Sequence, residues 1–289
     1  MVRVRKAVFP AAGFGTRFLP ATKSQPKEML PLVDKPVIQY VVEEAIASGL
    51  RNIIVVTGRG KRALEDHFDV SVELEQFLAD HQKADLLDTV RAVSGLANFA
   101  YIRQKEQLGL GHAVLVARDL VGDEPFAVFL GDDVIEAPVP AMKQMLDLFE
   151  RERCAVLAVE KVPRSMSSSY GMVRIEPGPG RAHRVLDLVE KPRPAEAPSD
   201  LGIIGRYILP PEIFTHLDRT AVDGRGEIQL TDALKSLLAE QRILAYEFEG
   251  IRYDTGHKLG FLKATVECAL RRADVGPEFR AWLKALRLD

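Results

Sequence analysis

The chain has 289 residues, of which 47% are apolar and 28% charged, and its formal net charge is −2. This composition suits a globular protein with a large core, and the near-neutral charge gives no reason to expect a nucleic-acid or membrane partner. No apolar run approaches the roughly 18 residues of a membrane-spanning helix, and no signal-like run follows the basic start, so we expect a cytoplasmic protein. The two cysteines, Cys154 and Cys268, lack Cys-x-x-Cys spacing, and we expect them to be buried free thiols.

Strand-like and helix-like segments alternate through the first half. We expect strands over 4–9, 53–57, 99–103, 126–130 and 155–162, and helices over 37–48, within 60–93, and over 111–119 and 140–153. Such repeats predict an α/β fold whose mostly parallel sheet is covered by helices on both faces. Loops 11–27, 104–109 and 131–133 each follow a strand. We therefore expect them to meet at the carboxyl edge of the sheet, where ligands bind.

The second half has short strands separated by turns rich in proline and glycine. We expect strands over 172–175, 185–189, 203–209 and 243–248, and helices over 229–241, 258–271 and 277–286. The proline and serine runs are too brief for linkers. The pattern favours one domain over 1–289.

The loop after the first strand carries Gly13, Gly15, Arg17 and Lys27. Small residues let a polyanion approach backbone N–H groups, and two cations bracket the same loop. The loop is not a dinucleotide fingerprint, because Phe18 stands where the third glycine is needed, and the chain has no P-loop. A phosphate-binding loop is favoured, and an ordinary glycine-rich turn remains the alternative.

Other polar groups follow strands or open helices. Asp132 and Asp133 come after the strand at 126–130, and paired carboxylates suit Mg²⁺, although a solvated turn is an equal alternative. Glu190-Lys191 could bind sugar hydroxyls and a phosphate, but alone it reads as a surface ion pair. Gln104 offers a donor and an acceptor to a base edge, or is an exposed loop residue. We interpret His112 as structural, because it opens an apolar helix face.

The segment 9–32 contains the motif G-x-G-T-R…P-K, and its continuation to Val42 is followed by further blocks. These blocks lie at 104–113, 130–133, 170–173, 190–192, 205–207 and 253–256. Together they resemble the sugar-1-phosphate nucleotidylyltransferases, and most closely the bacterial members that use UTP and glucose 1-phosphate. The resemblance implies a Rossmann-like mixed, mostly parallel sheet flanked by helices, the nucleotide-diphospho-sugar transferase fold. It also implies a nucleotide-binding half (1–162), a sugar-binding half (163–257) and C-terminal helices (258–289).

The resemblance assigns roles by position. It implies that the nucleotide is bound by Ala11, Ala12, Gly13, Gly15, Thr16, Arg17, Lys27, Gln104 and Gly109. It implies that the sugar phosphate is bound by Asp133, Gly171, Glu190, Lys191 and Ile204, and Mg²⁺ by Asp132 and Asp254. The catalytic residues would be Arg17, Lys27, Asp132 and Lys191. Asp133 would face the sugar or order its loop. This chain reads Leu-Gly-Asp-Asp where close relatives often read Leu-Pro-Asp, which alters the stiffness of the loop.

The implied activity is Mg²⁺-assisted formation of UDP-glucose and diphosphate from UTP and glucose 1-phosphate, by a homodimer or homotetramer. Two alternatives stay open. One is a related nucleotidylyltransferase that uses dTTP or another sugar 1-phosphate. The other is a non-catalytic paralogue that binds a nucleotide sugar. A dinucleotide-binding oxidoreductase is disfavoured by Phe18 and Pro20.

Overall fold

The computed structural model describes residues 3–178 and 180–287. Its strands are β1 (Lys6–Pro10), β2 (Pro31–Leu32), β3 (Lys35–Pro36), β4 (Asn52–Thr57), β5 (Asn98–Arg103), β6 (Phe126–Phe129), β7 (Asp133–Glu136), β8 (Ala155–Lys161), β9 (Gly171–Glu176), β10 (Ala182–Glu190), β11 (Leu201–Leu209), β12 (Ile243–Glu247) and β13 (Ile251–Asp254). Its α-helices are α1 (Val37–Ala47), α2 (Arg62–Phe68), α3 (Val72–Asp80), α4 (Ala84–Ser94), α5 (Gly109–Val116), α6 (Arg118–Val121), α7 (Ala141–Glu152), α8 (Ile213–Arg219), α9 (Leu230–Leu238), α10 (Lys258–Arg271) and α11 (Gly276–Ala285).

One large sheet runs through both halves of the chain. Within the described residues it has nine strands in the spatial order β5-β4-β1-β6-β11-β8-β12-β10-β9. Strands β5, β4, β1 and β6 are parallel to one another, as are β8 and β12. Strand β11 is antiparallel to β6 and β8, and β10 is antiparallel to β12 and β9. The sheet is therefore mixed, and most of its strands point the same way.

The core lies on both faces of this sheet, because successive residues of each buried strand point to opposite sides. On β1, Ala7 and Phe9 pack into one apolar cluster and Val8 into the other. Helices α1, α2 and α7 supply most of the helical cover of the first face, and α5, α8 and α9 cover the second. Strands buried on both faces read as continuous apolar runs in the sequence, which is why they were recognised.

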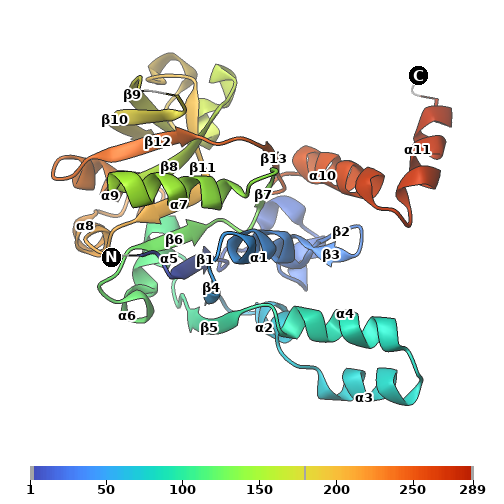
Figure 1. Ribbon diagram of the computed structural model, residues 1–289. Helices are drawn as coiled ribbons and strands as arrows, with labels where there is room; N and C mark the ends of the chain where they lie inside the picture. Colours follow the sequence, from blue (N-terminus) through green and yellow to red (C-terminus); the bar gives the residue numbers. More distant parts are fainter. Residues whose placement is uncertain (1–2, 179, 288–289) are drawn as a thin grey trace.

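A second, smaller ribbon crosses the carboxyl edge of the sheet. Strands β7 and β13 pair antiparallel, and Asp254 stands directly opposite Asp133 in their register. Figure 1 shows this ribbon between the main sheet and α10, while α3 and α4 extend together from the β5 side. The ribbon brings acids that are distant in the sequence to one place.

The predicted strands and helices are confirmed, with shifts at their ends, except that the helix expected over 111–119 is divided into α5 and α6. The sequence analysis missed β2, β3, β7, β13 and α8. Strands β7 and β13 have only four residues each, too few to show a period. Helix α8 follows Pro210 and Pro211, which masked its start.

Two smaller expectations can be compared with the structure. In the part of the chain that is described, no helix is both long and apolar enough to cross a membrane. Cys154 and Cys268 are free, as expected, but each is half-buried rather than buried.

Candidate active site

The loop after β1 forms one wall of a pocket of about 510 Å³, called here the glycine-loop pocket. It is lined by Pro10, Ala12, Gly13, Phe14, Gly15, Thr16, Lys27, Glu28, Gln104, Gln107, Gly109, Leu110, Ala113, Leu130, Asp132 and Glu227. Loops that follow β1, β5 and β6 therefore meet at one edge of the sheet, as the strand directions require. Gly15 adopts a φ of +66°, a left-handed conformation that favours glycine.

A second pocket of about 250 Å³, the Glu190 pocket, adjoins the first. It is lined by Arg17, Gly109, Leu110, Leu130, Asp132, Asp133, Ser169, Tyr170, Gly171, Glu190, Lys191, Ile203, Gly205, Tyr207, Glu227, Gln229, Thr231, Arg252 and Asp254. Asp132 lines both pockets. The two pockets also share Gly109, Leu110, Leu130 and Glu227, so they meet along the loop between β6 and β7 and the start of α5.

Asp132 and Asp254 face a common space beside Gly256. A Cβ atom built on Gly256 would lie 2.7 Å from Oδ2 of Asp132 and 3.0 Å from Oδ1 of Asp254. A side chain at that position would thus fill the gap between the two carboxylates. Among the described residues no group of three or more His, Cys, Asp or Glu side chains could hold a metal ion. Two carboxylates fit Mg²⁺, which completes its oxygen shell with water and substrate phosphates.

Lys27 supplies the positive charge next to this gap. Its Nζ lies 2.6 Å from Oδ2 of Asp132. Burial works against the ammonium, but the Asp132 carboxylate outweighs burial and holds the pKa of Lys27 above its usual value. Burial likewise works against the charged Asp132, but Lys27 outweighs it and holds the pKa of Asp132 below its usual value. Both groups are therefore charged at neutral pH.

Asp133 orders the loop instead of facing the Glu190 pocket with a free carboxylate. Its Oδ1 accepts from Nε of Arg252 at 2.6 Å, and its Oδ2 accepts from the backbone N–H of Gly205 at 2.9 Å. The side chains of Asp133 and Arg252 are each only 7% exposed. Of the two roles considered for Asp133, the hydrogen bonds favour loop ordering.

Gln104 is buried at the wall of the glycine-loop pocket. Its amide nitrogen lies 3.1 Å from the carbonyl oxygen of Gly109 and 3.0 Å from Nδ1 of His112. Because a carbonyl only accepts, the Gly109 contact assigns the amide orientation, and Nδ1 of His112 then acts as the second acceptor. Both amide donors are used, so only Oε1 remains to accept from a ligand.

Glu190 and Lys191 end β10 beside the Glu190 pocket. Oε1 of Glu190 lies 2.9 Å from Nζ of Lys191, and Oε2 accepts from the Thr231 hydroxyl at 2.7 Å. Lys191 has a φ of 46°, an uncommon conformation for a residue with a Cβ. Gly171 lies opposite: a Cβ there would come within 2.8 Å of the Thr231 hydroxyl oxygen and 3.2 Å of Oε2 of Glu190. The glycine keeps this side of the pocket open.

Two predicted site residues do not line either pocket. The side chain of Ile204 is 1% exposed and packs in the cluster under α1 and α7, while its neighbour Ile203 lines the Glu190 pocket. Strand alternation explains why the side chains of these two neighbours point to opposite sides of the sheet. Ala11 is also buried, and its N–H donates to the carbonyl oxygen of Val56. Neither the Ala11 side chain nor its N–H is available to a ligand.

Sequence reasoning missed several polar residues that line the pockets, namely Gln107, Glu227, Gln229, Thr231 and Arg252. Nε2 of Gln107 donates to the carbonyl oxygen of Ala12, tying the glycine loop to the loop after β5. The segment 227–231, which runs into the first turn of α9, alternates polar and apolar residues, and this alternation was the available signal.

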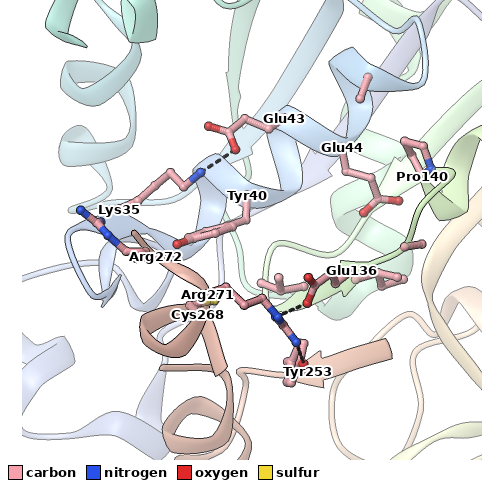
Figure 2. Close-up of a pocket in the computed structure, with 14 residues that line it drawn as sticks. Lys35, Tyr40, Glu43, Glu44, Glu136, Pro140, Tyr253, Cys268, Arg271 and Arg272 are labelled. Atoms are coloured by element: carbon pink, nitrogen blue, oxygen red, sulfur yellow. Dashed lines mark hydrogen bonds and ion pairs between the residues drawn. The ribbon is translucent and has the colours of Figure 1, made fainter. Parts of the chain in front are cut away.

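A third cavity, of about 560 Å³, lies away from these two pockets. We call it the ribbon pocket, because β7 and β13 contribute Val134, Ile135, Glu136 and Tyr253 to its wall. Figure 2 shows that the cations Lys35 and Arg271 at this cavity are paired with Glu43 and Glu136. Glu44 of α1 also lines it.

Comparison with known proteins shows the family of the chain. The chain matches the nucleotidyl transferase family over residues 6–270. A UTP–glucose-1-phosphate uridylyltransferase of Staphylococcus epidermidis is 50% identical over 286 residues, covering 99% of each chain. One of Bacillus subtilis is also 50% identical over 286 residues, covering 99% of this chain and 98% of the relative.

Solved structures lead to the same group. A UDP-glucose pyrophosphorylase complexed with UDP-glucose is 45% identical with a TM-score of 0.86, covering 93% of this chain and 100% of the other. A UTP-bound UGPase from Acinetobacter baumannii is 39% identical with a TM-score of 0.91, covering 98% and 100%. The chain therefore belongs to the nucleotidyl transferase family, among its UTP–glucose-1-phosphate uridylyltransferases.

Proposed function

We propose that this chain joins UTP and α-D-glucose 1-phosphate to give UDP-glucose and diphosphate. One observation carries the proposal: the glycine-loop pocket and the Glu190 pocket meet at Asp132. A triphosphate in the first pocket and a sugar phosphate in the second would bring their reacting phosphates together at this junction. The 50% identical uridylyltransferases support the same substrate pair.

The reaction needs no general base. A phosphate oxygen of glucose 1-phosphate, already anionic at neutral pH, attacks the α-phosphorus of UTP in line. The new P–O bond forms as the bond to the β-phosphate bridging oxygen breaks, and diphosphate leaves. The protein therefore contributes positioning and charge neutralisation.

The charged residues of the two pockets have complementary roles. Arg17 and Lys27 neutralise the phosphates of UTP and the departing diphosphate. Lys191 orients the phosphate of the sugar, and Glu190 accepts hydrogen bonds from its hydroxyls. Nucleotidyl transferases generally use a divalent metal, and here we propose Mg²⁺, which Asp132 and Asp254 would hold and which would supply further charge neutralisation at the α-phosphate.

Oε1 of Gln104 accepts from N3–H of uracil, while the backbone around Ala12 and Gly13 faces the same pocket. Thymine shares the imide edge of uracil, so this contact does not separate UTP from dTTP. The use of dTTP or of another sugar phosphate therefore remains the second candidate function. A purely binding paralogue would have no need for the complete set of charged residues at the junction.

The direct test is an assay of the purified chain with UTP, glucose 1-phosphate and Mg²⁺. We expect UDP-glucose and diphosphate in equal amounts, and no product after chelation of the metal. Binding of UTP without product under these conditions would instead support the non-catalytic alternative.

A further inference from the structure

Arg206 of β11 is fully buried, and its whole guanidinium is engaged. Its Nη1 group donates to the carbonyl oxygens of Leu130 at 3.3 Å and Gly205 at 2.9 Å. Its Nη2 group donates to the carbonyl oxygen of Asp133 at 2.6 Å and to Oε2 of Glu44 at 2.6 Å. Nε donates to the same Glu44 carboxylate at 3.1 Å. All five donors of the guanidinium fork therefore have acceptors.

Two of these acceptors bracket the loop that carries Asp132. The carbonyl oxygens of Leu130 and Asp133 belong to the residues on either side of Gly131-Asp132, and one rigid fork holds both. On the other side, Thr255 donates through its N–H at 2.8 Å and its hydroxyl at 2.7 Å to the carbonyl oxygen of Asp132. Arg206 and Thr255 together fix the backbone from which the Asp132 carboxylate projects.

Glu44 anchors the fork from the helical layer. Its carboxylate accepts from Nε and Nη2 of Arg206 and also from the backbone N–H of Met142 at 3.1 Å, in the first turn of α7. Figure 2 shows Glu44 reaching from α1 toward Pro140, where α7 begins. Its side chain is 6% exposed, so the ion pair with Arg206 is almost completely withdrawn from water.

Such a pair is a poor device for stability alone. Desolvation of two charges offsets most of their attraction, and apolar residues of similar volume often stabilise a core equally well. The Glu44–Arg206 pair instead joins α1, α7 and β11 to the loop at which the two pockets meet. The guanidinium of Arg206 also donates to three backbone carbonyl oxygens, and an apolar pair would leave these oxygens without donors.

We propose that Glu44 and Arg206 are positioning residues for the metal: they hold the loop 130–133 so that Asp132 faces Asp254. The proposal rests on the proposed function, because it assumes that these two carboxylates bind a divalent ion with UTP. Neither positioning residue lines the gap itself, so each acts through the backbone of the loop.

The test compares Arg206→Met with the double variant Glu44→Met/Arg206→Met. The single change leaves the Glu44 carboxylate buried without its cation, so the melting temperature should fall. The double change removes both charges and should regain only part of that loss, because the backbone carbonyls that Arg206 pairs with stay without a donor. Mn²⁺ binding is followed by electron paramagnetic resonance with UTP and without glucose 1-phosphate, so that no turnover takes place. We expect Mn²⁺ affinity to fall by about 10- to 100-fold in both variants, the usual scale for groups that orient metal ligands.

Arg242→Met is the matched control. Arg242 forms an ion pair with Glu152 at the surface, and both residues are distant in the sequence from the loop 130–133. It should bind Mn²⁺ as the wild type does. If the double variant regains both melting temperature and Mn²⁺ affinity, the pair is only structural and the proposal is wrong. If the wild type itself shows no UTP-dependent Mn²⁺ binding, the metal site fails and the positioning proposal fails with it. Should Arg206→Met not fold, the double variant alone decides.

Discussion

Asp132 lies in the loop between β6 and β7, and Asp254 is the last residue of β13, but both carboxylates face the gap beside Gly256. Asp132→Ala and Asp254→Ala should each reduce turnover by at least about 100-fold, the scale of losing one preorganised electrostatic group. Steady-state kinetics at saturating Mg²⁺ measure the effect, and circular dichroism checks the fold. Asp123→Ala, in an exposed loop, is the control. Near-wild-type turnover in either variant would remove that residue from the metal site.

Glu190 is held by Thr231 on one oxygen and by Lys191 on the other. Glu190→Gln keeps the shape of the side chain but loses charge-assisted hydrogen bonds, worth about 1.5–3 kcal/mol each. The KM for glucose 1-phosphate should therefore rise, while the dissociation constant of UTP stays unchanged. Thr231→Val should have a smaller effect of the same kind. If Glu190→Gln weakens the binding of UTP and leaves the kinetics with glucose 1-phosphate unaltered, the assignment of Glu190 to the sugar is wrong.

The amide of Gln104 is oriented by Gly109 and His112, which leaves only an acceptor for the base. Uracil presents a donor at N3, whereas cytosine presents an acceptor there, so the fixed amide favours UTP over CTP. Gln104→Ala should reduce that preference by roughly 1–3 kcal/mol, the cost of an unpaired polar edge. His112→Phe should reduce it less, because the Gly109 carbonyl oxygen still accepts from the amide. Ratios of kcat/KM for UTP and CTP test both variants, and unchanged ratios would mean that the base is read elsewhere.

At the scale of elements, a histidine of α2 contacts a glutamine of α1. Nε2 of His67 lies 3.0 Å from Oε1 of Gln39, and burial lowers the pKa of His67 below 6.5. His67 therefore binds a proton more readily in the unfolded chain than in the folded chain. The free energy of unfolding should decrease as the pH falls below about 6.5, the pKa of an unperturbed histidine. His67→Gln should weaken this dependence. Melting temperatures at pH 7.5 and 5.5 test it, and an equal slope in both proteins would contradict it.

The elements that the sequence predicted are those with strong local patterns. Helix α10 was predicted with its observed ends, and the buried strands stood out as apolar runs. The ribbon of β7 and β13 was not predicted, because each strand is short and becomes regular only through its partner. The site shows the same limit. The loop with Gly13, Gly15, Arg17 and Lys27 was predicted from its spacing, and the roles of the other site residues from the resemblance. Arg252, Thr231 and the Glu44–Arg206 pair had no such signal, because they matter through contacts across the fold.

At the scale of the whole molecule, the continuous sheet joins the parts that the resemblance separates. We propose that 1–162 binds the nucleotide and 163–257 the sugar phosphate, because the first segment supplies nearly all of the glycine-loop pocket and the second supplies most of the Glu190 pocket. Helices α10 and α11 project beside the ribbon, and Leu259, Leu262 and Trp282 on them are more than half exposed. This exposed apolar surface supports the expected homodimer or homotetramer.

The most direct test of the account is diphosphate release measured across a panel of nucleoside triphosphates and sugar 1-phosphates. The geometry of the two pockets and the relatedness of the chain predict the highest kcat/KM for UTP with glucose 1-phosphate, and no release when either substrate is omitted. A higher kcat/KM for dTTP or for another sugar 1-phosphate would contradict the proposed substrates. If no pair of substrates gives diphosphate, the proposed enzymatic activity is wrong.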